Sequence, residues 1–322
     1  MRSDPGAGTD RAIFTSTVIP TIGRPDLQRA VESVLLQAPP RSFEVVVVND
    51  TGAPLPPGEW QSDPRVRILQ TDRKERCVAR NTGAAASRGV YLHFLDDDDW
   101  LLPGGLRGLH EAALETPGGF IYGATRLFDR RGAHLLDLEH GLAGNVAVQV
   151  MCGEWIPLQS ALIDKDLFFE LGGFHAWQAG AEDIDLARRA AVSTDFRYLP
   201  QLISVVVMGE SGSTTEHDRQ RERSRRGREL ILDQKETFRR MSDSADAPHR
   251  RGGLARVYLT SALWNLGRGR LAKALIRLFH GLAAILSSGR HLLRTGFWRA
   301  IARPYRSVTF SRGAANFSGA AG

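Results

Sequence analysis

The chain of 322 residues contains only two cysteines, Cys77 and Cys152, which excludes a disulfide framework and argues against a zinc site. It also lacks any uncharged apolar run of about 20 residues, the length needed to span a bilayer. Residues 1–11 are polar and lack the apolar segment of a signal peptide. We therefore expect a cytoplasmic location.

Three classes of phosphate-binding enzyme are disfavoured by missing motifs. A dinucleotide enzyme carries G-x-G-x-x-G/A after its first strand, whereas the near match at 267–272 lies in a predicted helical region. A phosphatase with an aspartate nucleophile carries D-x-D-x-T, but Trp100 follows Asp99 and the threonine is missing. A sugar-nucleotide pyrophosphorylase has a loop rich in Gly, Arg and Lys, and residues 19–26, IPTIGRPD, lack that density.

Charge is divided unevenly along the chain. Residues 1–218 have 20 Lys plus Arg against 30 Asp plus Glu, a net −10, whereas residues 219–322 have 22 against 6, a net +16. In this basic part, 271–286 has leucines at helical spacing, and aromatic residues lie among arginines further on. Basic amphipathic helices suit an anionic membrane surface; the alternative is that their apolar stripes pack within the protein. No nucleic-acid-binding module is recognised, and we expect no nucleic-acid partner.

The most informative segment is YLHFLDDDDWLLP, residues 91–103, in which an apolar run meets four consecutive acids. Four carboxylates at the end of a buried strand repel one another and need a cation or several hydrogen-bond donors nearby. Oxygen ligands suit hard ions such as Mg²⁺ or Mn²⁺, which are often held by one or two carboxylates plus substrate phosphates. The run predicts a metal-bound diphosphate; the alternative is a solvated acidic turn.

Strand and helix patterns alternate on either side of this segment. They lie at 17–37 (strand, turn and helix), 43–50 (strand), 66–69 (strand) and 80–87 (helix), before the strand that we expect to end at Asp96. This order predicts an α/β fold with parallel strands and helical crossovers. Ligands bind at the carboxyl ends of such strands, where Pro20, Asp50 and the acid run all fall.

Four segments together resemble a known family. They are VIPTIGRPDLQRAVESVLLQ (18–37), EVVVVNDTG (44–52), VARNTGAAASRGVYLHFLDDDDW (78–100) and LGGFHAWQAGAEDIDLARRA (171–190). In these segments the chain resembles a family 2 glycosyltransferase, the inverting type with the GT-A fold, over roughly residues 12–215. The resemblance implies a Rossmann-like, mostly parallel sheet flanked by helices. It also implies a nucleotide-diphosphate-sugar donor, a divalent metal (Mn²⁺ or Mg²⁺) and inversion at the anomeric carbon.

The same resemblance assigns the donor contacts. Asp50 would hydrogen-bond the base, usually uracil, and Pro20 and Thr21 would border its pocket; an Asx turn is the alternative at this position. Arg80 and Asn81 would lie beside the ribose and phosphates, since arginine suits bidentate phosphate contact. A structural ion pair to a neighbouring acid is the alternative for the arginine.

Within the acid run, the D-x-D signature of the family matches Asp96, Asp97 and Asp98. Asp98 is predicted to contact the metal, and Asp96 to meet the ribose or a metal-bound water. Asp99 has two interpretations, a cap for a following helix or a second metal contact, and we prefer the cap. Because the four acids are identical, the sequence leaves open a shift of this match by one residue. His217, in a polar loop, is a further candidate metal ligand.

A second acidic cluster opens a predicted helix at GAEDIDLARRA, residues 180–190. An inverting transfer needs one general base to take the proton of the acceptor hydroxyl. By resemblance this base is Asp183, with Glu182 orienting it or touching the acceptor. The alternative is structural, because the helix dipole favours acids in a first turn. Trp155 and Gln159 are predicted acceptor contacts, with core packing as the alternative for Trp155.

We thus predict a disordered N-terminus at 1–11, a GT-A catalytic domain at 12–218, a basic helical extension at 219–306 and a disordered tail at 307–322. The expected activity is metal-dependent transfer from a nucleotide-diphosphate-sugar, with a UDP-sugar favoured, to a glycan, glycolipid or lipid-linked acceptor. Such work would build surface polysaccharide at the inner face of the cell membrane. The alternative is a glycosyltransferase-like protein that binds sugar nucleotide or glycan without turnover.

Overall fold

The computed structural model describes residues 13–209 and 214–303, without the side chains of 214–217. The predicted disordered segments at 1–11 and 307–322 lie outside these residues. The described chain forms two compact units. Unit 1 holds the residues up to Glu139 together with Pro157–Ala176 and Tyr198–Gly209, and unit 2 holds His140–Ile156, Trp177–Arg197 and the residues from 214 on.

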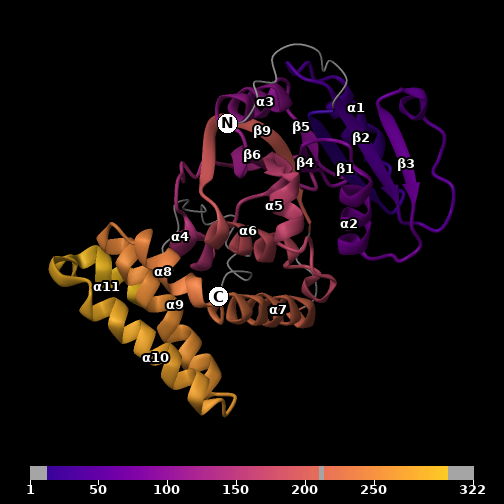
Figure 1. Cartoon of the computed structure of the whole chain (residues 1–322). Helices are drawn as coiled ribbons and strands as arrows, with labels where there is room; N and C mark the ends of the chain where they lie inside the picture. The colour runs from indigo at the N-terminus through magenta and orange to yellow at the C-terminus, as the bar shows by residue number, and fades with distance from the viewer. Residues whose placement is uncertain (1–12, 210–213, 304–322) are drawn as a thin grey trace. The chain divides into compact units, whose positions relative to one another are not determined.

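Unit 1 is built on a sheet with the strand order β3-β2-β1-β4-β8-β6-β9-β5, with β7 paired to β6 (Figure 1). The parallel strands are β1 (Thr15–Thr21), β2 (Phe43–Asn49), β3 (Val66–Gln70) and β4 (Tyr91–Phe94). The other strands are β5 (Trp100–Leu101), β6 (Phe120–Asp129), β7 (His134–Leu138), β8 (Ala161–Asp164) and β9 (Phe196–Met208). Strand β8 is antiparallel to β4 and to β6. The α/β fold class is confirmed, and antiparallel strands extend its parallel half.

Helices pack on both faces of the parallel strands. Those of unit 1 are α1 (Leu27–Leu35), α2 (Arg76–Ala86), α3 (Gly105–Glu115) and α5 (Lys165–Glu170), with 3-10 turns η1 (Glu59–Ser62) and η2 (Leu158–Ser160). Every residue of β1 and β2 is buried, as expected for strands covered on two sides. Ile19 clusters with Val31 of α1, whereas Val18, on the other face, meets Gly83 of α2. A Cβ at Gly83 would lie 2.4 Å from Cγ1 of Val18, so glycine permits this close approach.

Strand register brings the predicted site residues to one edge. Thr21, the last residue of β1, pairs with Asn49, the last of β2. Strand β4 ends at Phe94, opposite Val18, two residues earlier than predicted. The acid run therefore continues past the sheet beside the end of β1.

Unit 2 is helical. Its elements are α4 (Ala147–Met151), α6 (Glu182–Ser193), α7 (Thr214–Leu232), α8 (Lys235–Asp243), α9 (Pro248–Leu266), α10 (Leu271–Leu286), η4 (Gly289–Leu293) and α11 (Thr295–Ala302); η3 (Ala176–Gln178) begins at its border. Its core joins Met151, Ile231, Leu254 and Tyr258. The bounds of α10 agree with the sequence prediction. No helix within the described ranges is long and apolar enough to cross a membrane.

Candidate active site

The four acids form a turn between β4 and β5. The N–H of Asp99 donates to the carbonyl of Asp96 at 3.1 Å and closes the turn. Asp97 and Asp99 are buried, whereas Asp96 and Asp98 are partly exposed. The alternation lets two carboxylates point into the protein and leaves two within reach of a ligand.

The first and last acids of the run, Asp96 and Asp99, accept hydrogen bonds from other parts of the protein. Asp96 accepts hydrogen bonds from Nη2 of Arg80 at 2.5 Å and from Nε2 of Gln159 at 3.1 Å. Burial alone would raise its pKa, but the charge and hydrogen bond of Arg80 hold that pKa below its ordinary value. Asp99 accepts from the same Gln159 amide at 2.9 Å and from the N–H of Val207 at 2.8 Å. Burial, with the charge of Asp96, raises the pKa of Asp99 well above its ordinary value.

The helix cap predicted for Asp99 is wrong. The residues that follow it form strand β5, and the next helix, α3, begins only at Gly105. Its carboxylate instead ties the acid run to β9 through Val207 and to the η2 turn through Gln159. These contacts fix the orientation of Asp99, and which acid of the run contacts a metal stays a prediction.

The two middle acids of the run, Asp97 and Asp98, share the guanidinium of Arg24. Nη1 of Arg24 lies 2.9 Å from Oδ1 of Asp97 and 2.8 Å from Oδ2 of Asp98. Asp97 also accepts from the Thr21 hydroxyl at 2.7 Å. Even so, burial and the neighbouring acids raise the pKa of Asp97 and that of Asp98. One guanidinium therefore faces two carboxylates, Asp97 and Asp98.

The carboxylates of the acid run and the arginines beside them fit a hard divalent cation bound together with an anionic ligand. The side chain of Asp98 is 25% exposed, and its carboxylate oxygens are the ligand type that Mg²⁺ and Mn²⁺ prefer. No group of three or more His, Cys, Asp or Glu side chains in the described chain could hold a metal alone. The remaining ligands would therefore come from water or from a diphosphate.

Asp50 organises the loop that leads to α2. Its carboxylate accepts from the Thr71 hydroxyl at 2.8 Å and from the N–H groups of Arg73 and Glu75 at 2.8 and 2.7 Å. Burial alone would raise its pKa, but these donors hold the pKa below its ordinary value. The Asx turn beside it is formed by Asn49, whose Oδ1 accepts from Thr51. The base contact of Asp50 stays a prediction.

Arg80 and Asn81, adjacent in α2, have different surroundings. Arg80 is buried, and its guanidinium lies 5.4 Å from the ring centroid of Phe174. The Asn81 amide donates to the Phe174 carbonyl at 2.8 Å and accepts from its N–H at 2.9 Å. Asn81 thus fixes the loop after α5, and Arg80 fixes Asp96. The donor contacts expected for both residues stay predictions.

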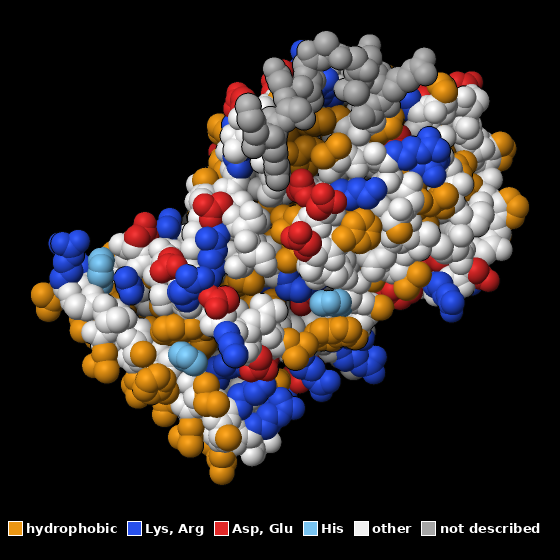
Figure 2. Space-filling view, viewed as in Figure 1, with side chains coloured by type: hydrophobic (Ala, Val, Ile, Leu, Met, Phe, Trp, Pro, Cys, Tyr) orange, Lys and Arg blue, Asp and Glu red, His pale blue; other side chains and the backbone are white. Residues whose placement is uncertain are grey.

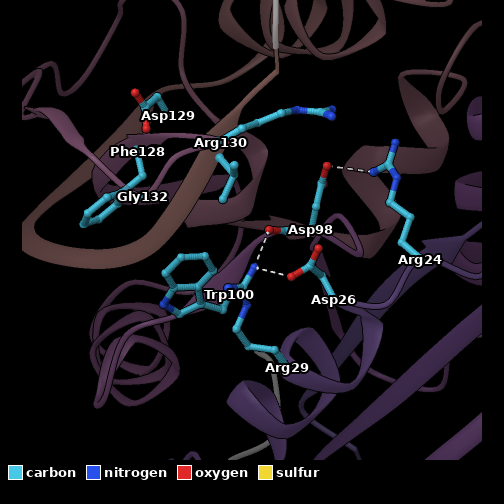
Figure 3. Close-up of a pocket in the computed structure, with 10 residues that line it drawn as sticks. Arg24, Asp26, Arg29, Asp98, Trp100, Phe128, Asp129, Arg130 and Gly132 are labelled. Atoms are coloured by element: carbon cyan, nitrogen blue, oxygen red, sulfur yellow. Dashed lines mark hydrogen bonds and ion pairs between the residues drawn. The ribbon is translucent and has the colours of Figure 1, made fainter.

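A cavity of about 440 Å³ adjoins Asp98 (Figure 3). It is lined by Arg24, Asp26, Arg29, Asp98, Trp100, Phe128, Asp129, Arg130, Gly132 and Val207. The Arg29 guanidinium stacks on Trp100 at 3.9 Å and donates to the Asp98 carbonyl at 3.1 Å. Three arginines and two aromatic rings thus line the cavity beside Asp98, together with Asp26 and Asp129. Guanidinium groups suit an anionic ligand, and aromatic rings suit a planar or sugar group.

The predicted base lies in unit 2 at the start of α6. Nε1 of Trp155 donates to Oδ2 of Asp183 at 2.9 Å, and the N–H of Ile184 donates to Oδ1 at 2.7 Å. Glu182 is buried and accepts from the N–H of Gly180, a structural contact at the helix start. Trp155 therefore orients the Asp183 carboxylate, a contact that neither predicted role for the tryptophan included.

Several contacts were not anticipated from sequence. The sequence predicted Arg24 and Arg29 only as parts of a turn and a helix. Four acids at a strand end require cations nearby, and Arg24 lies three residues after the end of β1. Gln159, predicted to face the acceptor, bridges Asp96 and Asp99. His217 lies in α7, but its side chain is outside the described residues, and its metal role stays a prediction.

Comparison with solved structures identifies the fold. Staphylococcus aureus TarS, residues 1–349, whose structure was solved in complex with UDP-GlcNAc, superposes with a TM-score of 0.58 at 12% identity, over 83% of this chain and 90% of that one. The fold is that of GT-A glycosyltransferases.

Sequence comparison gives the family. Residues 16–140 match the profile of Glycosyl transferase family 2. The succinoglycan biosynthesis protein ExoO of Rhizobium meliloti is 42% identical over 88 residues, which are 26% of this chain and 25% of that protein. EpsJ of Bacillus subtilis, an uncharacterized glycosyltransferase, is 32% identical over 106 residues, 31% of this chain and 30% of that protein. Residues 16–140 thus resemble glycosyltransferase family 2, and the matches span between a quarter and a third of these two relatives.

Proposed function

We propose that the chain is an inverting, metal-dependent glycosyltransferase that moves a sugar from a nucleotide-diphosphate-sugar to a hydroxyl group. The observation that carries this proposal is the pairing of two carboxylates, Asp97 and Asp98, with the single guanidinium of Arg24, beside a cavity that three arginines help to line. A site of this kind favours a cation together with an anionic ligand. The UDP-GlcNAc held by TarS supports a UDP-sugar as the donor.

Each group on the donor side has a separate task. A bound Mg²⁺ or Mn²⁺ would supply Lewis-acid stabilisation of the charge on the departing diphosphate. Asp98 would hold that ion, while Arg80 and Gln159 keep Asp96 oriented. Arg24 is partly exposed, and it is available to contact a phosphate once a bound cation neutralises Asp97 and Asp98.

Asp183 is the proposed general base. Its carboxylate takes the proton of the acceptor hydroxyl as that oxygen forms a bond to the anomeric carbon, and the bond from this carbon to the diphosphate oxygen breaks. The Trp155 indole N–H holds Oδ2 of Asp183 and so limits the orientations of the base. Attack opposite the leaving diphosphate inverts the anomeric configuration.

The acceptor we propose is a glycan, a glycolipid or a lipid-linked precursor of a surface polysaccharide. The name of ExoO, a succinoglycan biosynthesis protein, supports polysaccharide synthesis as the setting. Work in the cytoplasm, at the inner face of the cell membrane, stays a prediction from the sequence.

Calorimetric titration tests the donor site. UDP, GDP and dTDP are titrated into the full chain with Mn²⁺, with Mg²⁺ and with neither ion. We expect metal-dependent binding of UDP that Asp98→Asn weakens at least about tenfold. Asp63→Asn is the matched control, because Asp63 pairs only locally with Arg65 and should leave binding unchanged. No nucleotide binding under any condition would refute the donor site.

Asp183→Asn separates catalysis from binding alone. The variant should bind nucleotide like the wild type while transfer of labelled sugar to acceptor falls by about 10²–10⁴-fold, the usual contribution of a general base. Nucleotide binding without donor hydrolysis or transfer in the wild type, over a broad acceptor screen, would favour the non-catalytic alternative.

A further inference from the structure

Helix α10 carries its large apolar side chains on the outside. Seven of them are between 39% and 80% exposed: Leu271, Leu275, Ile276, Leu278, Phe279, Leu282 and Leu286. At 3.6 residues per turn they share an arc of about 160°. We call these seven residues the α10 face. The sequence predicted the helix and most of this stripe, and the structure shows that the stripe does not pack within its own unit.

The buried side of α10 explains this orientation. Arg277, with 3% of its side chain exposed, pairs with Asp233 at 2.5 Å and lies 3.6 Å from Glu229. A Cβ at Gly281 would lie 2.8 Å from Cδ2 of Leu259, so α9 and α10 approach closely at this glycine. Rolling α10 to bury its leucines would break these ion pairs and lose this contact. The α10 face is therefore fixed outward.

Exposed apolar side chains continue on the neighbouring elements. Leu263 and Leu266 near the end of α9 are 69% and 53% exposed, Leu293 of η4 is 88% exposed and Trp298 of α11 is 52% exposed. Figure 2 shows hydrophobic side chains gathered along α10. An exposed apolar surface of the extent of the α10 face marks an interaction site, since soluble monomers rarely expose one.

The charge around the α10 face selects its partner. Residues 247–303 contain 11 Lys plus Arg and no Asp or Glu. Arg270 precedes α10, and Arg290 and Arg294 follow it, all with exposed side chains, whereas Arg268 is paired with Glu222 at 2.8 Å. A second copy of the chain would bring the same cations against one another. An anionic bilayer instead offers phosphates to the arginines and acyl chains to the leucines.

We propose that the α10 face and its flanking arginines bind the surface of an anionic phospholipid membrane. The leucines and Phe279 enter the region between headgroups and acyl chains, and the arginines contact lipid phosphates. This inference rests on the proposed function only for its purpose, which is to keep the chain where lipid-linked acceptors lie. The binding itself needs neither donor nor turnover.

Co-sedimentation of the full chain with vesicles tests the proposal. We expect binding to vesicles with about one third phosphatidylglycerol, much weaker binding to pure phosphatidylcholine and partial release by 0.5 M salt. The double variant Leu275→Ser/Phe279→Ser should lose at least about tenfold in vesicle affinity. Leu36→Ser, at an 83% exposed leucine in unit 1, is the matched control and should bind like the wild type.

Two results would overturn the proposal. One is equal sedimentation of the wild type with and without anionic vesicles. The other is a dimer in analytical ultracentrifugation that the double variant abolishes, which would assign the face to a second copy. Circular dichroism checks folding, and Leu286→Ser, at an 80% exposed position, replaces the double variant if that fails to fold. Nucleotide titration of the same variants keeps this outcome separate from that of the proposed function, because donor binding should be unchanged.

Discussion

The ion pair between Arg80 and Asp96 should contribute measurably to stability. Only 8% of the Arg80 side chain and 28% of the Asp96 side chain are exposed, and the two groups lie 2.5 Å apart. A hydrogen bond to a charged group contributes about 1.5–3 kcal/mol, and an unpaired buried charge adds to the loss. Since Asp96 keeps the Gln159 amide as a donor, we expect Arg80→Met to cost about 2–3 kcal/mol at pH 7.

Urea unfolding of four proteins measures this directly. The wild type, Arg80→Met, Asp96→Asn and the double variant form a cycle whose coupling energy should be about 2 kcal/mol. Arg76→Met is the control: Arg76 is exposed and acts on Asp96 through charge, so its loss should cost at most about 0.5 kcal/mol. Equal effects of the two arginine variants, or a coupling energy below about 0.5 kcal/mol, would refute the assignment of Arg80 as the principal counter-charge.

The pair should also show a defined pH dependence. The folded protein holds the pKa of Asp96 below its ordinary value, so the contribution of the pair is fully present above about pH 4 and is lost as the pH falls through the lower, folded pKa. Without Arg80, burial raises the pKa of Asp96, so the difference between wild type and Arg80→Met should be largest near pH 7 and shrink as the pH falls through that raised pKa towards the lower pKa of the wild type. A difference that grows with acid would contradict this sign.

Two further substitutions test the base and the packing. Trp155→Phe keeps the ring but removes the donor to Asp183, so kcat should fall about tenfold with its acidic limb moved to higher pH, while KM for the donor is unchanged; an unchanged pH profile would contradict a positioning role. Gly83→Ala should cost about 1–3 kcal/mol in thermal unfolding because its Cβ would lie 2.4 Å from Val18, whereas Gly296→Ala in α11, with nothing within 4 Å, should be neutral or slightly stabilising.

Much of the parallel half of the fold could be read from the sequence because its signals are local. The β-branched run at 43–50 forms β2, the strand predicted at 66–69 forms β3, and the acids at 182–185 begin α6. Fully buried strands and amphipathic helices depend on periods of two and 3.6 residues, which a single segment displays. Because the carboxyl ends of parallel strands lie at the same edge of a sheet, these strands also predicted where the candidate site lies.

Other features depend on contacts that no local pattern contains. Four identical acids have no internal phase, so the sequence did not tell that Asp99 turns inward to Val207. Gln159 joins the acid run from 60 residues further along the chain. For α10, the period of the leucines predicted the helix but not which of its sides faces the core. The buried Arg277 and Gly281 determine that side. Contacts between residues far apart in the sequence, rather than hydrophobic spacing, decided these cases.

The way the acid run is neutralised bears on how the ion would be used. Arg80, Gln159 and Val207 hold Asp96 and Asp99, and Arg24 contacts Asp97 and Asp98, so every carboxylate of the run already has a partner within the protein. Unit 1 should therefore fold without divalent cations and survive chelators. A cation that reaches Asp98 must compete with a guanidinium already in contact. We expect such an ion to be an exchangeable companion of the nucleotide, arriving with each donor and departing with each diphosphate, rather than a permanent part of the protein.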